Sequence, residues 1–262
     1  MQALHIASTG MMAQELNVEV ISNNIANMRT AGFKRQRAEF QDLLYQNLRR
    51  IGAQTSEQGT VVPAGVQIGS GVMTAATPRV MSQGTVLPTE KDLDIAIRGE
   101  GFFQIELPDG RTAYTRAGTF ERDSNGTIVT PDGYVVQPGI TIPENARDVT
   151  IAADGTVQAF IGNASTPQTL GQIELARFVN KSGLEAIGDN LFLETASSGA
   201  ALTGSPGDEG FGSVLQGHIE LANVNAVSEI SDLIAAQRAY EMNARVIRAA
   251  DDMMSNTAQM IR

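Results

Sequence analysis

The sequence predicts a multi-domain α+β protein with a helix at each end, an extended connecting region and a central all-β domain. Three observations support this fold class. Apolar residues recur at heptad spacing near both ends of the chain, turn motifs interrupt short alternating strands in the middle, and a stretch rich in Gly, Gln, Ser and Thr separates the first helix from those strands. A chain of 262 residues is long enough to form two or three such domains.

The first expected helix covers residues 3–28. Its apolar positions alternate steps of three and four residues, which is the spacing of a coiled-coil seam, and Gly32 supplies a stop signal after it. Seven of the eight seam positions are apolar, and the seam consists of Leu4, Ala7, Met11, Gln14, Val18, Ile21, Ile25 and Met28. A narrow stripe of this kind favours packing against another helix.

The second expected helix begins near Asn225 and continues a heptad pattern to the last residues of the sequence. Polar Asn243 and Thr257 within the pattern would fix the register of a helix pair, unless the seam is drawn slightly wrong. The pattern leaves open whether the two helices form a hairpin within one chain or also pack against other copies. Seven of its nine positions are apolar: Leu233, Ala236, Tyr240, Asn243, Ile247, Ala250, Met254, Thr257 and Ile261.

The region after the first helix begins with a basic run and continues with a stretch that lacks regular hydrophobic periodicity. Residues 29–50 carry six basic and two acidic residues, whereas the rest of the chain carries 13 basic and 27 acidic residues. This basic run could contact acidic faces of adjacent subunits or form a solvated helix face. Residues 46–72 keep neither the helical nor the strand period, so an extended ribbon is predicted at about 46–66.

Residues 86–204 are predicted to form a compact all-β domain. Residues 92–99 alternate apolar and polar side chains, which is typical of a half-buried strand. The two glycines of residues 98–103 are expected to allow a bulge or tight bend, because the third glycine and the helix of a dinucleotide-binding loop are absent. Four turn motifs that place a glycine at positive φ follow: Pro108-Asp109-Gly110, Ser124-Asn125-Gly126, Pro131-Asp132-Gly133 and Asp154-Gly155.

Composition argues against several classes of function. The chain has no Cys and two His, so neither a disulfide framework nor a zinc site is expected. Its net charge of -10 argues against nucleic-acid binding, and no apolar run reaches membrane-spanning length. No nucleophile motif or carboxylate pair indicates catalysis, including hydrolysis of cell-wall glycan. Because no basic residue precedes Arg29, we expect no cleaved signal peptide.

Three stretches resemble the bacterial flagellar axial proteins, the family of rod and hook subunits. Among its branches, the segment at 46–66 makes the chain most similar to distal rod members, with a proximal rod or hook protein as the alternative. The three stretches are VISNNIANMRTAGFKRQRAEFQDLL (20–44), DLDIAIRGEGFFQIELPDGRTAYTRAGTFERDSNGTIVTPDGYVVQPG (92–139) and LQGHIELANVNAVSEISDLIAAQRAYEMNARVIRAADDMM (215–254).

The resemblance implies a structural subunit of the distal rod and not an enzyme. Such subunits are exported through the flagellar export apparatus without a cleaved signal and polymerise helically in the periplasm into a tubular drive shaft that transmits motor torque to the hook. Proximal rod proteins, the hook protein and the surrounding ring proteins are the implied partners, without direct membrane insertion. The implied division is a coiled-coil-like axial core (1–30 with 224–262), a connecting region (31–85 with 205–223) and an outer β domain (86–204).

The expected self-assembly interface combines the two seams with the SNNIAN motif at 22–27. The amides of this motif would bridge backbone carbonyls of a neighbouring copy, with simple end-capping as the alternative. The alternative outside this family is that the chain is a secreted surface-binding module whose helical ends form a small oligomer of fixed size. The expected interface residues are Leu4, Met11, Val18, Ile21, Asn23, Asn24, Ile25, Asn27, Met28, Leu233, Tyr240, Asn243, Ile247, Met254 and Ile261.

Overall fold

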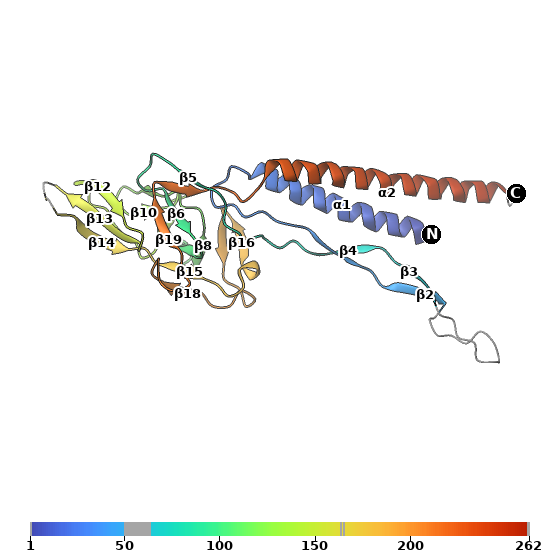
Figure 1. Ribbon diagram of the computed structural model, residues 1–262, viewed down its shortest axis with the longest axis horizontal. Coiled ribbons are helices and arrows are strands. Elements are labelled where there is room, and N and C mark those ends of the chain that lie inside the picture. The colour runs from blue at the N-terminus through green and yellow to red at the C-terminus, as the bar shows by residue number, and fades with distance from the viewer. Residues whose placement is uncertain (1, 50–63, 163, 165, 261–262) are drawn as a thin grey trace. The chain divides into compact units, whose positions relative to one another are not determined.

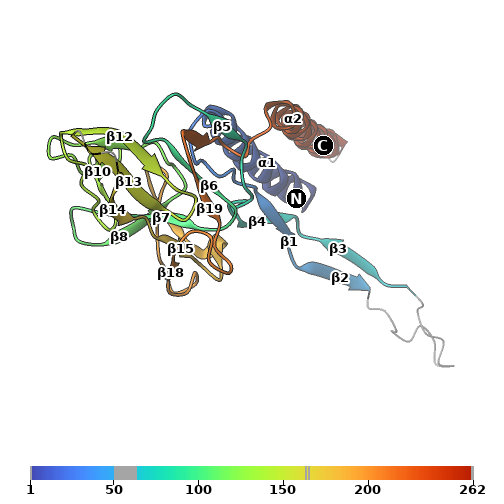
Figure 2. The same cartoon turned by 60° about the vertical axis from the view of Figure 1, so that its left-hand side comes forward.

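A computed structural model describes residues 2–49, 64–162, 164 and 166–260 of the chain (Figures 1 and 2). It consists of two compact units. The first, here called the helical unit, comprises Met1–Ile25, Gln36–Pro78 and Asn225–Arg262. The second, here called the β unit, comprises Ala26–Arg35 and Arg79–Val224. Each unit is described separately below.

The helical unit contains two long antiparallel helices, α1 (Gln2–Ala26) and α2 (Ala226–Met260). Asn24 near the end of α1 bonds to Glu229 near the start of α2, whereas Leu4 and Ala250 line one groove at the opposite ends. The helix pair predicted from the heptad pattern is therefore present, with boundaries shifted by one or two residues. The side-chain oxygen of Asn225 accepts a 3.0 Å hydrogen bond from the amide of Val227 and caps α2.

Helix α2 extends past the beginning of α1. It has 35 residues against 25 in α1, a difference of about 15 Å at 1.5 Å per residue. Since Asn24 lies level with Glu229 and Leu4 lies level with Ala250, the excess lies at the C-terminal end of α2 (Figure 1). Residues 251–260 are all exposed.

A narrow antiparallel ribbon completes the helical unit. Strand β1 (Glu39–Asp42) pairs with β4 (Val72–Ala76), and β2 (Tyr45–Arg49) pairs with β3 (Val66–Gly69). The amide of Val72 donates a 3.3 Å hydrogen bond to the hydroxyl of Thr9, which attaches the ribbon to α1. Most of the segment predicted at 46–66 lies outside the described residues, so its structure there stays a prediction.

The β unit is built from antiparallel sheets. A three-stranded sheet contains β12 (Ala146–Ile151), β13 (Thr156–Ile161) and β14 (Gln168–Gln172), and two-stranded pairs join β6 (Ile95–Arg98) to β19 (Ser213–Gln216) and β5 (Val86–Pro88) to β20 (His218–Glu220). One 3-10 turn, η1, spans Lys181–Gly183. In the described residues the largest sheet has nine strands: β16 (Glu185–Gly188), β17 (Leu191–Leu193), β8 (Thr112–Thr115), β7 (Phe102–Glu106), β11 (Val135–Val136), β10 (Ile128–Val129), β9 (Glu121–Arg122), β15 (Leu175–Arg177) and β18 (Leu202–Gly204).

The turn glycines adopt the backbone conformation that the sequence predicted. Gly110, Gly126, Gly133 and Gly155 have φ values of 81°, 81°, 87° and 81°, which residues with a Cβ rarely adopt. The glycines of residues 98–103 also make a bend, with φ of 107° at Gly99 and 141° at Gly101. These local predictions are confirmed.

Strand β6 corrects one expectation. The alternation at 92–99 predicted a half-buried strand, but Ile95, Ala96 and Ile97 are all at most 1% exposed. Both faces of β6 are covered, and alternation fails to show this because Ala96 is small and the neighbouring Asp94 is itself buried. The strand belongs to the apolar core of the β unit, whose fully buried members include Phe103, Ile105, Val157, Ile173 and Leu175.

In the described parts of the chain, neither α1 nor α2 combines the length and the apolar character that a membrane span requires.

Candidate assembly interface

The α2 seam is covered by α1 mainly where its residues are small. Ala236 and Ala250 are 3% and 7% exposed, and Leu233, Asn243 and Ile247 are half-buried. The larger seam residues remain accessible, since Tyr240 is 40% and Met254 is 39% exposed. The last seam position, Ile261, lies outside the described residues.

The buried face of α1 matches the predicted seam at Ala7 and Ile21 and otherwise departs from it. Leu4, Met11, Val18 and Ile25 are only half-buried, and Ile21 is the predicted interface residue on this seam that is fully buried. The reason is that α1 contacts two partners, α2 and the ribbon held by Thr9, so its covered surface is broader than one stripe. The other buried residues of α1 are Ala7, Ala13, Val20 and Asn24.

Gly10 of α1 lies directly against the side chain of Asn243 of α2. A Cβ placed on Gly10 would lie 2.8 Å from Nδ2 of Asn243, which is inside van der Waals contact. The amide side chain therefore packs directly on the backbone of α1. This contact is consistent with a role for Asn243 in helix register, which stays a prediction.

Asn24 makes its hydrogen bonds within its own chain. It is 1% exposed, and Nδ2 donates to the carbonyl of Gln36 at 2.8 Å and to Oε2 of Glu229 at 3.1 Å. The amide of Gln36 in turn donates to Oδ1 of Asn24 at 2.9 Å. The expectation that this amide bridges to another copy is therefore wrong for Asn24, because its donor and acceptor atoms are already used.

The other two asparagines of the SNNIAN motif are placed differently. Asn23 is exposed on α1. Asn27 follows the last residue of α1, where its Oδ1 accepts a 3.2 Å hydrogen bond from the hydroxyl of Thr30. Met28 is 38% exposed and also lies beyond the helix, in the turn that leads to Gly32 with φ of 70°. Asn27 thus bonds within the turn after α1, while the parts that Asn23 and Asn27 take in assembly stay predictions.

Helix α2 carries a second apolar face that the heptad count missed. Met242 is 59%, Val246 is 47%, Met253 is 63% and Met260 is 87% exposed. Their steps of four, seven and seven residues place them along one side of the helix, offset from the seam. Following a second register from Met242 would have found them. An open apolar groove, lined by Leu4, Met253 and Met254, adjoins this face.

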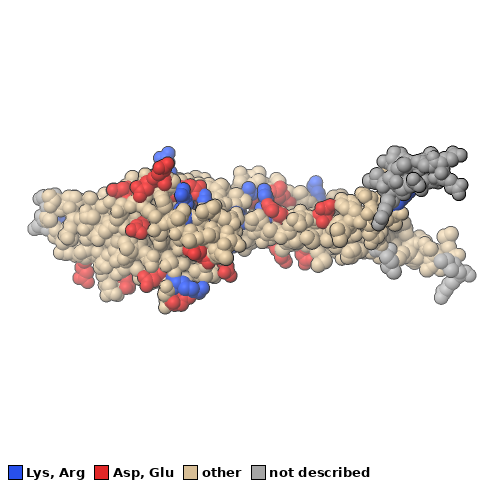
Figure 3. All heavy atoms as spheres, turned by 90° about the horizontal axis from the view of Figure 1, so that it is seen from below, with Lys and Arg blue, Asp and Glu red and all other residues tan. Residues whose placement is uncertain are grey.

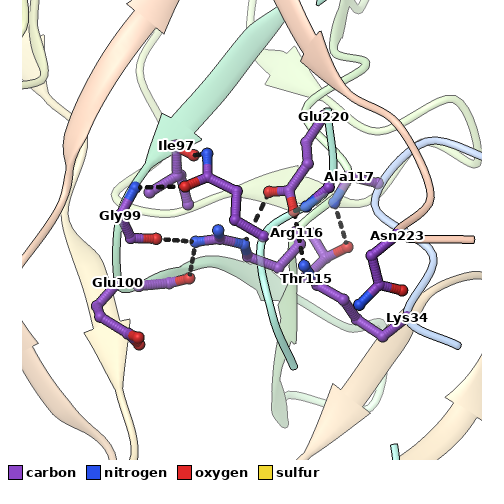
Figure 4. Close-up of polar contacts among 12 residues, drawn as sticks. Lys34, Ile97, Gly99, Glu100, Thr115, Arg116, Ala117, Glu220 and Asn223 are labelled. Atoms are coloured by element: carbon purple, nitrogen blue, oxygen red, sulfur yellow. Dashed lines mark hydrogen bonds and ion pairs between the residues drawn. The ribbon is translucent and has the colours of Figure 1, made fainter. Parts of the chain in front are cut away.

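Lys34 in the β unit occupies a buried charged cluster with Glu220 and Arg116 (Figure 4). Its Nζ lies 2.6 Å from Oε1 of Glu220 and donates to the carbonyl of Ser82 at 2.8 Å. The Nε of Arg116 lies 3.0 Å from Oε2 of Glu220, and its Nη1 donates to the carbonyl of Gly101 at 2.7 Å. The side chains of Lys34, Glu220 and Arg116 are 1%, 0% and 5% exposed.

Burial dominates the electrostatics of this cluster. It lowers the pKa of Lys34 below 10.5, even though the charge of Glu220 and its hydrogen bond oppose the shift. Burial likewise lowers the pKa of Arg116, again against the attraction of Glu220. Lys34 and Arg116 are therefore both buried, and they share one carboxylate, that of Glu220, as their ion-pair partner.

The cluster corrects the interpretation of the basic run at 29–50. Residues 29–49 form turns, strands and irregular segments, so the solvated helix face is wrong for them, and Lys34 contacts Glu220 of its own chain instead of a neighbour. Arg37 pairs with Glu39 at 2.5 Å on the surface. Figure 3 shows one face of the molecule with wide uncharged areas between scattered acidic and basic side chains, in keeping with a charged fraction of 18%.

Among the described residues, no group of three or more His, Asp or Glu side chains is arranged to hold a metal ion. The exposed apolar faces of α2 are surfaces that can pack against other protein.

Family models match three parts of the chain. Residues 4–34 match "Flagella basal body rod protein", residues 96–159 match "Flagellar hook protein FlgE/F/G D1 domain", and residues 215–260 match "Flagellar basal body rod FlgEFG protein C-terminal". The first match contains Asn24 and Lys34, and the third contains Glu220 and Glu229. The residues paired by the two polar contacts thus lie in matched regions at opposite ends of the chain.

Curated relatives cover the whole chain. The flagellar basal-body rod protein FlgG of Caulobacter vibrioides is 60% identical over 260 residues, which is 99% of each chain. The proteins of the same name from Agrobacterium fabrum and Bacillus subtilis are 51% and 36% identical, each over 100% of both chains. With such identity over its full length, the chain belongs to the flagellar basal-body rod protein family.

Proposed function

We propose that this protein is a structural subunit of the flagellar distal rod, which assembles with copies of itself into a helical drive shaft that transmits motor torque to the hook. One observation carries the proposal: the terminal helices pack together, yet large apolar side chains on them stay uncovered. Met242, Val246 and Met253 of α2 are 59%, 47% and 63% exposed. The full-length similarity to proteins named FlgG supports the rod and not the hook or the proximal rod as the assembly.

The uncovered helix faces supply the driving force for assembly. Fully burying a wholly exposed Met or Val side chain contributes about 1.5–3 kcal/mol, so covering these partly exposed side chains in each copy offsets part of the loss of freedom on association. A contact between two different faces of the same chain repeats without closing when the rotation between copies does not return to its start, and it then generates an open helical filament. The seam residues and the second α2 face are the surfaces proposed for these contacts.

The proposed arrangement has three layers. The terminal segments 1–30 and 224–262 form a coiled-coil-like axial core, 31–85 with 205–223 connect, and 86–204 form an outer β domain. The ribbon segment at about 46–66 is the proposed stiffener, because extended backbone laid across neighbouring copies would resist bending. Deleting this segment should give a more flexible or curved polymer, and an equally straight polymer would contradict that role.

Proximal rod proteins, the hook protein, the ring proteins and the flagellar export apparatus are the proposed partners, and the rod within the periplasm is the proposed location. The expected route is export without a cleaved signal peptide. These proposals rest on family membership, and none requires a cofactor or an enzymatic activity.

Electron microscopy of the purified protein tests the assembly. We expect open-ended filaments whose length grows with protein concentration, and no filaments from a chain that lacks 1–28 and 224–262. A defined small oligomer at all concentrations would favour a surface-binding module. A truncated chain that still forms filaments would contradict assembly through the helices.

Expression in bacteria tests the rod assignment. In a Caulobacter vibrioides strain without its own FlgG, the intact chain should restore swimming, since the two proteins are 60% identical over 99% of their length. A chain with Met242, Val246 and Met253 replaced by Ser should accumulate equally but fail to restore swimming. Full restoration by this variant would contradict the role of the second α2 face.

A further inference from the structure

The β unit is held together by residues from opposite ends of the chain. Lys34 and Glu220 are separated by 186 positions, and their side chains form a 2.6 Å ion pair. A backbone hydrogen bond joins the same two regions, since the amide of Gly32 donates to the carbonyl of Glu220 at 2.8 Å. The amide of Arg35 donates to Oδ1 of Asn223 at 2.8 Å. Residues 212–223, here called the closing segment, therefore meet the N-terminal part of the unit directly.

Two strands of the β unit find their partners only in the closing segment. In the described residues, β6 has β19 as its one partner strand and β5 has β20 as its one partner strand. The amide of Thr89, just after β5, donates to the carbonyl of Gly217 at 2.6 Å. Until the closing segment is in place, the backbone groups of both strands on these edges have no protein partner.

Several other pairings of the β unit join segments that are close in sequence, whereas β15 pairs with β7 and β17 pairs with β8 across 72 to 78 positions. Strands β7 and β8 make a hairpin closed by Gly110, whose amide donates to Leu107, and β9 and β10 make one closed by Gly126, whose amide donates to Asp123. Strands β12, β13 and β14 pair in chain order. These contacts require short loops, whereas those of the closing segment join residues more than a hundred positions apart.

Glu220 also controls whether the cations can be buried. Lys34 and Arg116 each pair with this carboxylate, and its Oε1 further accepts a 2.8 Å hydrogen bond from the amide of Gly84. Without Glu220, two positive charges would face each other in a site that excludes water, which is strongly unfavourable. The polar cluster and the strand pairing thus depend on the same short segment (Figure 4).

We infer that the closing segment is the last part of the β unit to fold, and that the ion pairs of Glu220 hold this segment in place. When the chain becomes available to fold from its N-terminus onward, β5 and β6 stay unpaired until the closing segment is present. Lys34 and Arg116 stay solvated until residue 220 is available. Folding of the β unit is in this way coupled to the presence of nearly the whole chain, and an incomplete chain cannot present a closed β unit.

Pulsed hydrogen exchange during refolding of the full chain tests the order. The amides of Gly32 and Thr89 report closure, since their acceptors are Glu220 and Gly217, and those of Gly110 and Gly126 report the local hairpins. We expect the closure amides to become protected together with the amide of Leu221, at least about tenfold more slowly than the hairpin amides. Protection of Gly32 and Thr89 in the hairpin phase would overturn the inference.

Glu220→Gln tests whether Glu220 holds the closing segment in place. Glu209→Gln is its matched control, because Glu209 is an exposed glutamate a few residues before the closing segment. We expect Glu220→Gln to reduce protection of Gly32 and Thr89 at least about tenfold while Gly110 and Gly126 keep theirs. The control should leave all four amides unchanged. Equal protection of Gly32 and Thr89 in the Glu220→Gln variant and in the control would overturn the role of Glu220. If the variant fails to fold, the order observed for the unaltered chain decides the inference.

Discussion

The two units bury different kinds of side chain. The β unit encloses large apolar residues completely, since Phe103, Ile105 and Leu175 are 0% exposed. The buried residues of the helical unit include four alanines, among them Ala7 and Ala236, while many of its larger apolar side chains stay exposed. Removing large apolar surface from water is the main stabilising contribution to folding. The β unit therefore has the core of an independently stable domain, whereas the helical unit leaves large apolar surface uncovered within the single chain.

The largest expected effect breaks the β unit at its charged cluster. Glu220→Ala should lower the free energy of unfolding of this unit by about 3–5 kcal/mol, because it leaves Lys34 and Arg116 buried without their shared carboxylate. Urea unfolding monitored through the amides of the β unit would measure the loss. Glu209→Ala, at an exposed position, should change the same quantity by less than about 0.5 kcal/mol. A small effect of Glu220→Ala would show that the cluster does not stabilise the fold.

A matched pair of isoleucine substitutions compares the two units directly. Ile105→Ala, at 0% exposure in the β unit, should lower the free energy of unfolding by about 2–5 kcal/mol through lost burial and the cavity left behind. Ile234→Ala, at 44% exposure on α2, should change it by no more than about 0.5 kcal/mol in dilute monomer. Urea unfolding of both variants at low concentration checks this, and equal losses would contradict the contrast between the units.

Local features of this fold could be predicted because their signals are local. The helices follow from heptad spacing, and the turns at Gly110, Gly126, Gly133 and Gly155 follow from the need for positive φ. The same logic explains the error at β6, since the burial of Ala96 depends on neighbours that alternation does not report. A pattern within one element shows which side prefers to be covered and leaves the covering element unknown.

Long-range pairs are the part of the candidate site that sequence reasoning did not find. Asn24 was expected to contact another copy, but it bonds to Glu229, 205 positions away in the same chain. Lys34 was grouped with a basic run expected to contact adjacent subunits or to form a solvated helix face, although its partner Glu220 lies 186 positions away. Single-sequence patterns carry no information on such pairs, because a buried and an exposed ion pair use the same residue types. The assembly contacts of the seam residues remain predictions for the same reason.

The contact between Gly10 and Asn243 offers a smaller test within the helical unit. Gly10→Ala should lower the free energy of unfolding of the helix pair by about 1 kcal/mol, since crowding of about 1–3 kcal/mol is partly offset by the better helix propensity of Ala. Thermal unfolding followed by circular dichroism would measure it. In an Asn243→Ala background the same substitution should become neutral or stabilising. An unchanged effect in that background would show that Asn243 is not the group that Gly10 accommodates.

The smallest expected effect concerns acid stability at a turn of the β unit. The carboxylate of Asp154 accepts a 3.0 Å hydrogen bond from the amide of Thr156, and this bond lowers the pKa of Asp154 below its ordinary value of 3.8. A carboxyl group with a lower pKa in the folded state stabilises the fold above its unfolded-state pKa and loses that contribution as pH falls through the folded value. The contribution of the Asp154 carboxylate to stability is therefore lost in a window at pH 3.8 and below.

Asp154→Asn keeps a side-chain oxygen for the turn but removes the titration. The variant should be slightly less stable than the unaltered chain at pH 7, and this difference should shrink as pH falls through the window. The midpoint of urea unfolding at a series of pH values measures it. Asp132→Asn, in a turn where the described residues donate no hydrogen bond to the carboxylate, is the control and should leave the midpoint at pH 7 almost unchanged. A constant difference between the unaltered chain and Asp154→Asn across the series would mean that the turn hydrogen bond does not depend on the charge of Asp154. The acid sensitivity of the β unit would then have to come from other carboxylates.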